Sequence, residues 1–550
     1  MTKELDLLIQ NATIVDGSGS RPIKSDVAIC DGRISQIRTD ISTDANILID
    51  AKGLVLSPGF IDIHSHSDMS IPFDNRLESM IRQGVTTSVT GNCGSSLAPI
   101  NDETIDIIQK EFDIYSPPGH KLNITWRTFG EYLSTLTEIP FNVASLVGFG
   151  TIRVASGPGF ENREPTKKEL AAMKASVAEA MEAGAFGLST GLFYPPQSYA
   201  LTGEIIEIAK TVAEYDGLYF SHLRGEGATV VQAIEELIQI VEQSGCRGGQ
   251  IAHHKIAGKP YWGRSKETLK LIAEANNRSI RITCDQYPYN RGMTSILSLL
   301  PPWAHEGGME GVLSNLESLE SQKRIRQDVD GGIEGWENII KEIGWQNIYI
   351  ASTKTNKWKS AQGKSFQQLA EENGYSDEFL LLFQLLIDES GEGSMTIESM
   401  NEDDIQSIMK NKYTMIATDG WGISPTGVFS YAKPHPRSYG TFPRILGKYV
   451  REERLLTLEE AIWKMTGFPA VTLRLENRGL IREGYWADVV VFDPQTIHDK
   501  ATFLNPHQFP VGINHVIVNG ELVVTNGNQL DTFPGMVLRH KPWQSESRLT

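Results

Sequence analysis

Residues 57–70, SPGFIDIHSHSDMS, join an apolar run to two histidines that are two positions apart and flanked by aspartates. Side chains alternate between the two faces of a strand, so His64 and His66 point to the same side where they leave a strand end. Two imidazoles held in this way can bind one metal ion, and imidazole is a preferred zinc ligand. Two polar residues in a loop are the alternative for so short a motif. The apolar run before the pair favours a buried strand that ends at a metal site.

Similar apolar runs recur along the chain and alternate with stretches of helical period, such as KKELAAMKASVAEAMEAG and VVQAIEELIQIVEQSG. Eight strand segments with helices between them predict an α/β fold, a (β/α)8 TIM-like barrel. The segments are GFIDIHSH, TTSVTGNCG, NVASLVGFG, AFGLSTGLF, LYFSHLRGE, GQIAHHKIA, SIRITCDQY and YTMIATDGW.

The two ends of the chain have a different pattern, with short β-type runs separated by turn signals. An Asn-Gly dipeptide between Val516–Val518 and Leu522–Val524 is typical of a hairpin. We expect residues 1–58 and 480–550 to form one small β-sandwich domain, and residues 59–479 to form the barrel. About 120 residues precede the last barrel strand, more than one crossover helix needs, so we predict a helical, lid-like insertion at about 288–412 near the barrel mouth.

Composition limits the partners and the compartment. The chain has 550 residues and a net charge of −17, which disfavours binding to nucleic acid or to an anionic membrane and leaves a small molecule as the expected partner. Four widely spaced cysteines do not form a disulfide framework. The sequence has no long apolar segment of the kind that spans a bilayer or forms a signal peptide. We therefore expect a cytoplasmic protein.

Polar residues that can bind a metal or move a proton lie at or just after most of the predicted strands. The carboxyl ends of barrel strands converge on one face, so these residues can form one cluster. Asp419 could be a ligand, a general base or both, although Asp-Gly is also a common turn dipeptide. Neighbours on a strand face opposite ways, so His253 and His254 cannot both point inward. The residues are His64, His66, Cys93, His222, His253 or His254, Asp285 and Asp419.

Several segments resemble a known family. SPGFIDIHSHSD is similar to the metal-binding opening of the amidohydrolase superfamily. GVTTSVTGNCGSSLAP, EAGAFGLSTGLFYPP, YFSHLRGE, IAHHKIAG, DQYPY, ATDGWG, HPRSYGTFPRILG and NRGLIREGYWADVVVFDP resemble the D-aminoacylases, or N-acyl-D-amino-acid deacylases. These segments occur in order and extend over nearly the whole chain, from about Leu5 to His540.

The resemblance implies a set of metal ligands. Cys93, His222 and His253 would hold one zinc ion tightly, and His64, His66 and Asp419 would form a second, weaker metal position. The end of the fourth barrel strand carries only Ser189, Thr190 and Gly191. The bridging lysine carboxylate of other amidohydrolases is therefore absent, and Cys93 would take its place.

The resemblance also implies the reaction, which is zinc-dependent hydrolysis of the amide bond of N-acyl-D-amino acids. Asp419 would accept the proton of the attacking water and pass it to the leaving amine. Arg437 and Lys255 would bind the substrate carboxylate, and Tyr194 and Tyr287 would donate hydrogen bonds to the substrate. Arg291 could contact the substrate side chain, which would favour an acidic D-residue.

Two other functions remain open at this stage. The same metal site could hydrolyse another amide, either a cyclic amide or a dipeptide with a C-terminal D-residue. A catalytically silent scaffold that kept the fold is the third hypothesis, and the presence of every ligand type argues against it. Neither the preferred side chain nor the oligomeric state is encoded in a pattern that can be interpreted.

Overall fold

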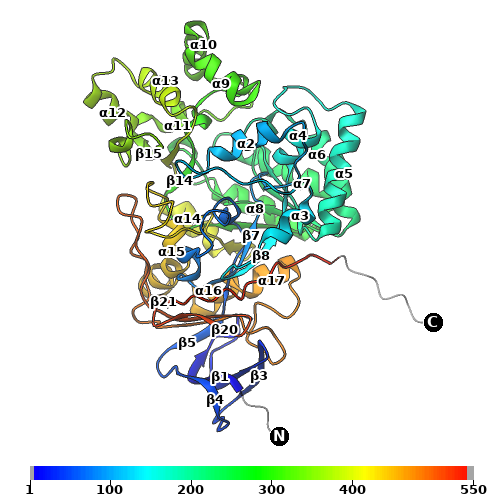
Figure 1. The fold of residues 1–550 in the computed structure, drawn as a ribbon, viewed down its shortest axis with the longest axis vertical. Helices are drawn as coiled ribbons and strands as arrows, with labels where there is room; N and C mark the ends of the chain where they lie inside the picture. The colour runs from blue at the N-terminus through cyan, green and yellow to red at the C-terminus, as the bar shows by residue number, and fades with distance from the viewer. Residues whose placement is uncertain (1–4, 542–550) are drawn as a thin grey trace, which may run out of the picture.

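The computed structural model describes residues 5–541, so the outermost residues of the predicted β-domain, 1–4 and 542–550, lie outside the described residues. The chain forms a central barrel with a β-sheet at one end and a mixed α/β insertion at the other (Figure 1). Within the described residues no helix is both long enough and apolar enough to cross a membrane.

Eight parallel barrel strands, called staves below because one of them is broken into two pieces, form the barrel, as the sequence predicts. The third stave is interrupted at Leu146, and its halves pair with the neighbours on either side. The last strand returns to the first through a parallel bridge between Ser65 and Gly420. The staves are β6 (Phe60–Asp62), β7 (Val85–Thr90), β8 (Asn142–Ser145) with β9 (Val147–Gly148), β10 (Gly187–Gly191), β11 (Leu218–His222), β12 (Gly249–Ile251), β13 (Ile282–Gln286) and β17 (Thr414–Ile416).

Helices connect and cover these strands. The longest, α5 (Lys167–Ala183), begins with a capping box between Thr166 and Glu169 and ends at Gly184 with φ 108°. Buried faces at helical spacing hold the helices on the barrel. The other helices of this layer are α1 (Glu78–Ile81), α2 (Ile105–Asp113), α3 (Phe129–Thr135), α4 (Phe149–Ser156), α6 (Thr202–Glu214), α7 (Val230–Ser244), α8 (Ser265–Asn277), α14 (Glu402–Lys410), α15 (Arg437–Arg444), α16 (Leu458–Met465) and α17 (Gly467–Leu473).

Strands from both ends of the chain share one nine-stranded sheet below the barrel (Figure 1). The two halves meet where β5 pairs antiparallel with β18. The predicted Asn-Gly hairpin joins β19 to β20, with φ 50° at Asn519 and φ 87° at Gly520. The strands are β1 (Leu5–Ile14), β2 (Ile23–Cys30), β3 (Arg33–Arg38), β4 (Ala45–Asp50), β5 (Val55–Pro58), β18 (Val489–Phe492), β19 (Ile513–Val518), β20 (Glu521–Thr525) and β21 (Asn528–Gln529).

The insertion between the last two staves has its own apolar core, which includes Leu316, Phe366 and Leu386. Besides the expected helices it contains a three-stranded antiparallel sheet in the order β14-β16-β15, which the sequence analysis did not anticipate. Its elements are β14 (Arg291–Ser295), α9 (Gly308–Glu317), α10 (Leu319–Gly331), α11 (Ile339–Ile343), β15 (Ile348–Ser352), α12 (Phe366–Asn373), α13 (Glu378–Asp388) and β16 (Ser394–Glu398). The insertion lies over the barrel face on which the strands end (Figure 1).

Candidate active site

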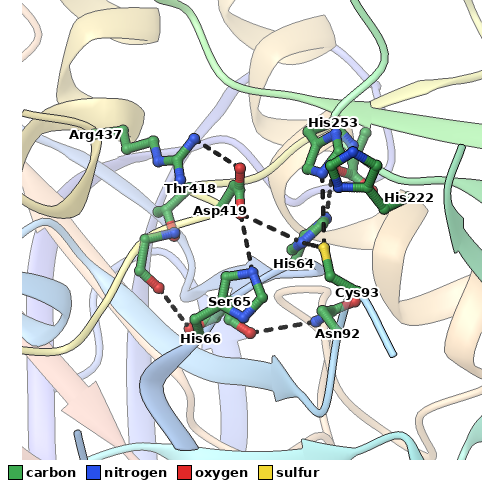
Figure 2. A network of polar contacts seen from close by, with 12 residues as sticks. His64, Ser65, His66, Asn92, Cys93, His222, His253, Thr418, Asp419 and Arg437 are labelled. Atoms are coloured by element: carbon green, nitrogen blue, oxygen red, sulfur yellow. Dashed lines mark hydrogen bonds and ion pairs between the residues drawn. The ribbon is translucent and has the colours of Figure 1, made fainter. Parts of the chain in front are cut away.

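The carboxyl ends of the barrel strands bring all six candidate ligands into one cluster (Figure 2). Every member except Cys93 and His66 is buried, and these two are intermediate in exposure. His64 and His66 follow β6, Cys93 follows β7, His222 ends β11, His253 follows β12, and Asp419 follows β17.

Cys93 lies between the two parts of this cluster. Its Sγ atom is 3.4 Å from His64 Nε2 and 3.6 Å from His253 Nε2. Tetrahedral zinc with ordinary bond lengths to sulfur and nitrogen separates two such ligands by roughly 3.5 Å. On the other side, Asp419 Oδ1 is 3.1 Å from His66 Nε2 and 3.4 Å from His64 Nε2. The group of His64, Cys93 and His253 and the group of His64, His66 and Asp419 therefore both have spacings that suit metal ligands.

His222 provides an independent indication of a metal ligand. Its side chain is buried, and neither of its ring nitrogens makes a hydrogen bond. The ring stands nearly perpendicular to that of His253, with 4.4 Å between the ring centres. The Nε2 atom is 3.7 Å from Glu226 Oε2, too far for a hydrogen bond. A buried imidazole without a hydrogen bond is costly, and a coordinated ion would satisfy it. The residues present thus fit a bound zinc ion.

Three candidate ligands have an unusual backbone conformation. Cys93, His253 and Asp419 have φ values of 53°, 34° and 47°, in the left-handed region that residues other than glycine seldom adopt. Such conformations cost free energy, and they gather at functional sites where the surrounding fold holds them. Here each turn directs a side chain inward at the end of a stave.

The fourth barrel strand, β10, provides no ligand, but its small residues allow the Cys93 turn to pack closely against it. A Cβ atom added at Gly191 would lie 2.3 Å from the carbonyl oxygen of Cys93, so β10 allows the backbone around Cys93 to approach it closely. Ser189 supports the same turn by accepting a hydrogen bond of 3.0 Å from the Gly94 N–H. The small residues at this strand end therefore make room for Cys93.

Asp285, which the sequence analysis placed at a strand end without a role, orients two of the histidines. Its Oδ1 accepts a 2.7 Å hydrogen bond from the backbone N–H of His253 and lies 3.2 Å from His64 Nδ1. At His64, a carboxylate on one ring nitrogen fixes the other nitrogen toward the cluster, and at His253 the bond holds the turn that carries the ring. His254 points away, with its Nε2 2.9 Å from Thr268 Oγ1, so His253 is the inward neighbour.

Charges around Asp419 keep its carboxyl ionised. Burial disfavours the charged form, but Arg437, His253 and His64 together hold the pKa of Asp419 well below its usual value. The nearest cation is Arg437, whose Nη1 is 2.6 Å from Asp419 Oδ2 (Figure 2). Arg437 is 5% exposed, so this ion pair is shielded from water. The long loop that follows Asp419 thus brings Arg437 back to the site.

Glu226 is a buried partner of the cluster that the sequence analysis missed. Its Oε1 is 2.5 Å from Lys255 Nζ and 3.1 Å from His253 Nδ1. Although burial opposes ionisation, Lys255 and the neighbouring histidines hold the pKa of Glu226 well below its usual value. The Arg-Gly-Glu sequence after His222 suggests a solvent-facing loop, and only the approach of Lys255 from the next stave shows that Glu226 turns inward.

The two predicted tyrosines line a cavity of about 350 Å³ above the cluster. The ring of Tyr287 lies 4.6 Å from the Arg437 guanidinium carbon and 5.9 Å from Lys255 Nζ, so it adjoins both cations. Tyr194 contacts the His222 ring at 4.8 Å between centres, and its hydroxyl accepts a 3.0 Å hydrogen bond from Thr294.

Arg291 does not lie where the sequence analysis expected it. Its Nη2 is 2.5 Å from Glu398 Oε2, and its guanidinium stacks on the rings of Tyr349 and Phe503. It is not among the residues that line the cavity. The partner that holds it comes from β16, more than a hundred residues further along the chain, so the sequence motif around Arg291 could not show it.

Comparisons with known proteins agree with this geometry. An amidohydrolase family model matches residues 48–267 and 392–524, leaving out most of the insertion. A D-aminoacylase of Alcaligenes xylosoxydans xylosoxydans is 35% identical over 94% of both chains, and an N-acyl-D-aspartate deacylase of the same organism is 35% identical over 99% of this chain and 97% of the relative.

A solved structure gives the same result. The N-acyl-D-glutamate deacylase of Bordetella bronchiseptica, complexed with zinc and a phosphonate mimic of the tetrahedral intermediate, superimposes with a TM-score of 0.81. It is 31% identical, and the alignment covers 98% of this chain and all of the relative. The chain is therefore a member of the amidohydrolase family and belongs, within it, to the D-aminoacylases, or N-acyl-D-amino-acid deacylases.

Proposed function

We propose that this protein hydrolyses the amide bond of N-acyl-D-amino acids in a zinc-dependent reaction and releases a carboxylate and a free D-amino acid. The observation that carries the proposal is the position of Cys93 between His64 and His253, with Asp419 beside them. Relatives that share this fold over nearly their whole length are named for this chemistry.

Cys93, His222 and His253 would hold a zinc ion tightly, because a soft thiolate and two imidazoles suit zinc. Imidazoles of His64 and His253 support the thiolate: despite burial, they hold the pKa of Cys93 well below its usual value. His64, His66 and Asp419 would form the second, weaker position. Bound zinc polarises the scissile carbonyl and makes water a better nucleophile near neutral pH.

Asp419 is the proton carrier in this proposal. Its pKa is low, so it is a carboxylate at neutral pH and can accept a proton from the attacking water at an Oδ atom. It then gives this proton to the nitrogen of the breaking amide bond, because an amine cannot leave as an anion. Its two oxygens already face His66 and Arg437, which fixes the orientation of the carboxylate.

Arg437, Lys255 and Tyr287 would bind the substrate carboxylate. A guanidinium matches a carboxylate with two parallel hydrogen bonds, and both cations adjoin the Tyr287 ring at the cavity wall. Tyr194 would orient the acyl amide from the opposite side, beside His222. The substrate carboxylate competes with Asp419 for Arg437, so binding would loosen that ion pair.

We further propose a cytoplasmic enzyme with small-molecule substrates and with neither a nucleic-acid nor a membrane partner. Cys93, Cys246 and Cys284 are free thiols, as a reducing compartment favours. The net charge of −17 opposes binding to polyanions.

Metal removal tests the proposal. Chelator-treated protein is expected to lose hydrolysis of N-acetyl-D-leucine, and about one equivalent of zinc per chain should restore it, with acetate and D-leucine formed in equal amounts. Zinc content is measured by mass spectrometry and products by chromatography. Zinc-loaded protein that leaves N-acetyl-D-leucine intact but opens a cyclic amide, or cleaves a dipeptide with a C-terminal D-residue, would replace the proposal with the other amide-hydrolase function.

A further inference from the structure

The cavity above the cluster is mostly apolar, and its charged groups are few. Among the described residues that line it, Lys255 and Arg437 are the only lysine and arginine, and each already faces a carboxylate. Much of the remaining wall consists of apolar side chains of α2 and the insertion, such as Ile108, Phe112 and Leu300.

Four carboxyl groups line the same cavity, and three of them have partners. Glu226 meets Lys255, Asp419 meets Arg437, and Glu337 accepts hydrogen bonds from the backbone N–H groups of Glu226 and Gly227. Glu111 alone has neither a hydrogen bond nor an ion pair within the described part of the chain.

Glu111 is the exception within an otherwise apolar wall. It belongs to α2, between Ile108 and Phe112, and α2 packs beside α4 of the barrel and α9 of the insertion (Figure 1). Burial alone raises its pKa to about 7. Tyr115 lines the same cavity, and burial, together with the charges of Glu111 and Cys93, raises its pKa to about 12. An unpaired carboxyl in such a place stabilises a cation that comes to it.

We propose that Glu111 binds an ammonium or guanidinium group at the far end of the substrate, so that the enzyme prefers N-acyl-D-amino acids that carry a positive charge on the side chain or on the acyl group. This inference rests on the proposed deacylase function. The proposed substrates differ from the aspartate and glutamate substrates named for two of the relatives. The cavity supports this difference, because both of its cations are already paired and neither is left for an acidic side chain.

Matched substrate pairs test the inference and distinguish the two sources of the charge. N-acetyl-D-lysine is compared with N-acetyl-D-2-aminoheptanoate, and N-(6-aminohexanoyl)-D-leucine with N-heptanoyl-D-leucine. Within each pair only the charged nitrogen differs from a methyl group. We expect kcat/KM to favour the cationic member of one pair by roughly tenfold or more, the usual effect of a hydrogen bond to a charged group.

The Glu111→Gln variant keeps the size of the side chain and removes its charge, so the preference in that pair should fall to near one while kcat/KM for the neutral member stays unchanged. Asp106→Asn is the matched control, because Asp106 is exposed on the same helix and does not line the cavity. Its variant should keep the full preference.

Product binding gives a measurement that does not need turnover. Zinc-loaded protein should bind either D-lysine more tightly than D-2-aminoheptanoate, or 6-aminohexanoate more tightly than heptanoate, and Glu111→Gln should remove the difference in calorimetry. Turnover of neutral N-acyl-D-substrates with no preference in either pair would overturn the Glu111 inference and leave the deacylase function intact. Failure to hydrolyse any N-acyl-D-substrate, together with equal binding of charged and neutral products, would overturn both.

Discussion

At the level of single residues, Asp419 links the parts of the site. One oxygen faces His64 and His66, and the other faces Arg437. The same carboxylate can therefore contact two histidine ligands, move a proton and hold the arginine that would bind substrate. A substitution at Asp419 can thus be tested for two separate effects, loss of turnover and loss of metal.

Asp419→Asn is expected to lower kcat by roughly 10²- to 10⁴-fold, the usual contribution of a positioned general acid–base group. One equivalent of zinc should remain, because Cys93, His222 and His253 are unchanged. Steady-state kinetics and metal analysis on the same sample check both statements. Asp106→Asn provides the comparison at an exposed position. Turnover close to that of the unmodified protein would exclude Asp419 as the proton carrier.

Among the elements, the close approach of β10 to the Cys93 turn positions the thiolate. Alanine at Gly191 would put a Cβ atom 2.3 Å from the Cys93 carbonyl oxygen, so the turn must move. We expect Gly191→Ala to lower zinc affinity and activity together. Gly203→Ala in α6 is the matched control, since nothing lies within 4 Å of its added Cβ and alanine favours a helix. Unchanged zinc affinity in Gly191→Ala would contradict this role of β10.

The insertion contacts the barrel through Glu337, whose carboxyl accepts backbone hydrogen bonds at Glu226 and Gly227. Burial, with Glu342 and Glu226 nearby, raises the pKa of Glu337 to about 8, compared with 4.5 for an ordinary glutamate. The folded state therefore keeps a proton that the unfolded chain releases. The free energy of unfolding should fall as pH rises from about 4.5 to about 8 and change little from this group outside that window.

Glu337→Gln removes this dependence while it keeps an acceptor oxygen. Above pH 8 the variant should be more stable than the unmodified protein by up to about 5 kcal/mol, because each pKa unit corresponds to about 1.4 kcal/mol, and the difference should vanish near pH 4.5. Denaturant unfolding at several pH values measures it, with Glu334→Gln, an exposed neighbour, as the control. A variant that is less stable than the unmodified protein at high pH would show that the ionised carboxylate is the form that docks the insertion.

For the whole molecule, the barrel could be predicted because each strand carries its own local signal, an apolar run that ends in a polar residue. Each of the eight predicted segments overlaps one barrel strand. The β14-β16-β15 sheet could not be predicted in the same way, because β16 pairs with β14 across about a hundred residues and with β15 across more than forty, and none of the strands is a long apolar run.

The site could be predicted as a set of residue types, but its contacts could not. His64 and His66 are recognisable from spacing alone. Glu226 and Asp285 become partners of the histidines only when other barrel strands bring Lys255 and His64 to them. Arg291 shows the reverse case, since a carboxylate from β16 removes it from the cavity. Partner choice for buried charges depends on the tertiary fold, which local patterns do not describe.

The most direct test of the central claim is amine release from paired N-acetyl-D- and N-acetyl-L-amino acids by the zinc-loaded protein. The panel includes leucine, methionine, phenylalanine, lysine, glutamate and aspartate. The account predicts release from D-forms alone, because Arg437, Lys255 and the metal cluster hold the carboxylate and the amide from fixed directions. Equal release from both enantiomers, or release from L-forms only, would contradict it.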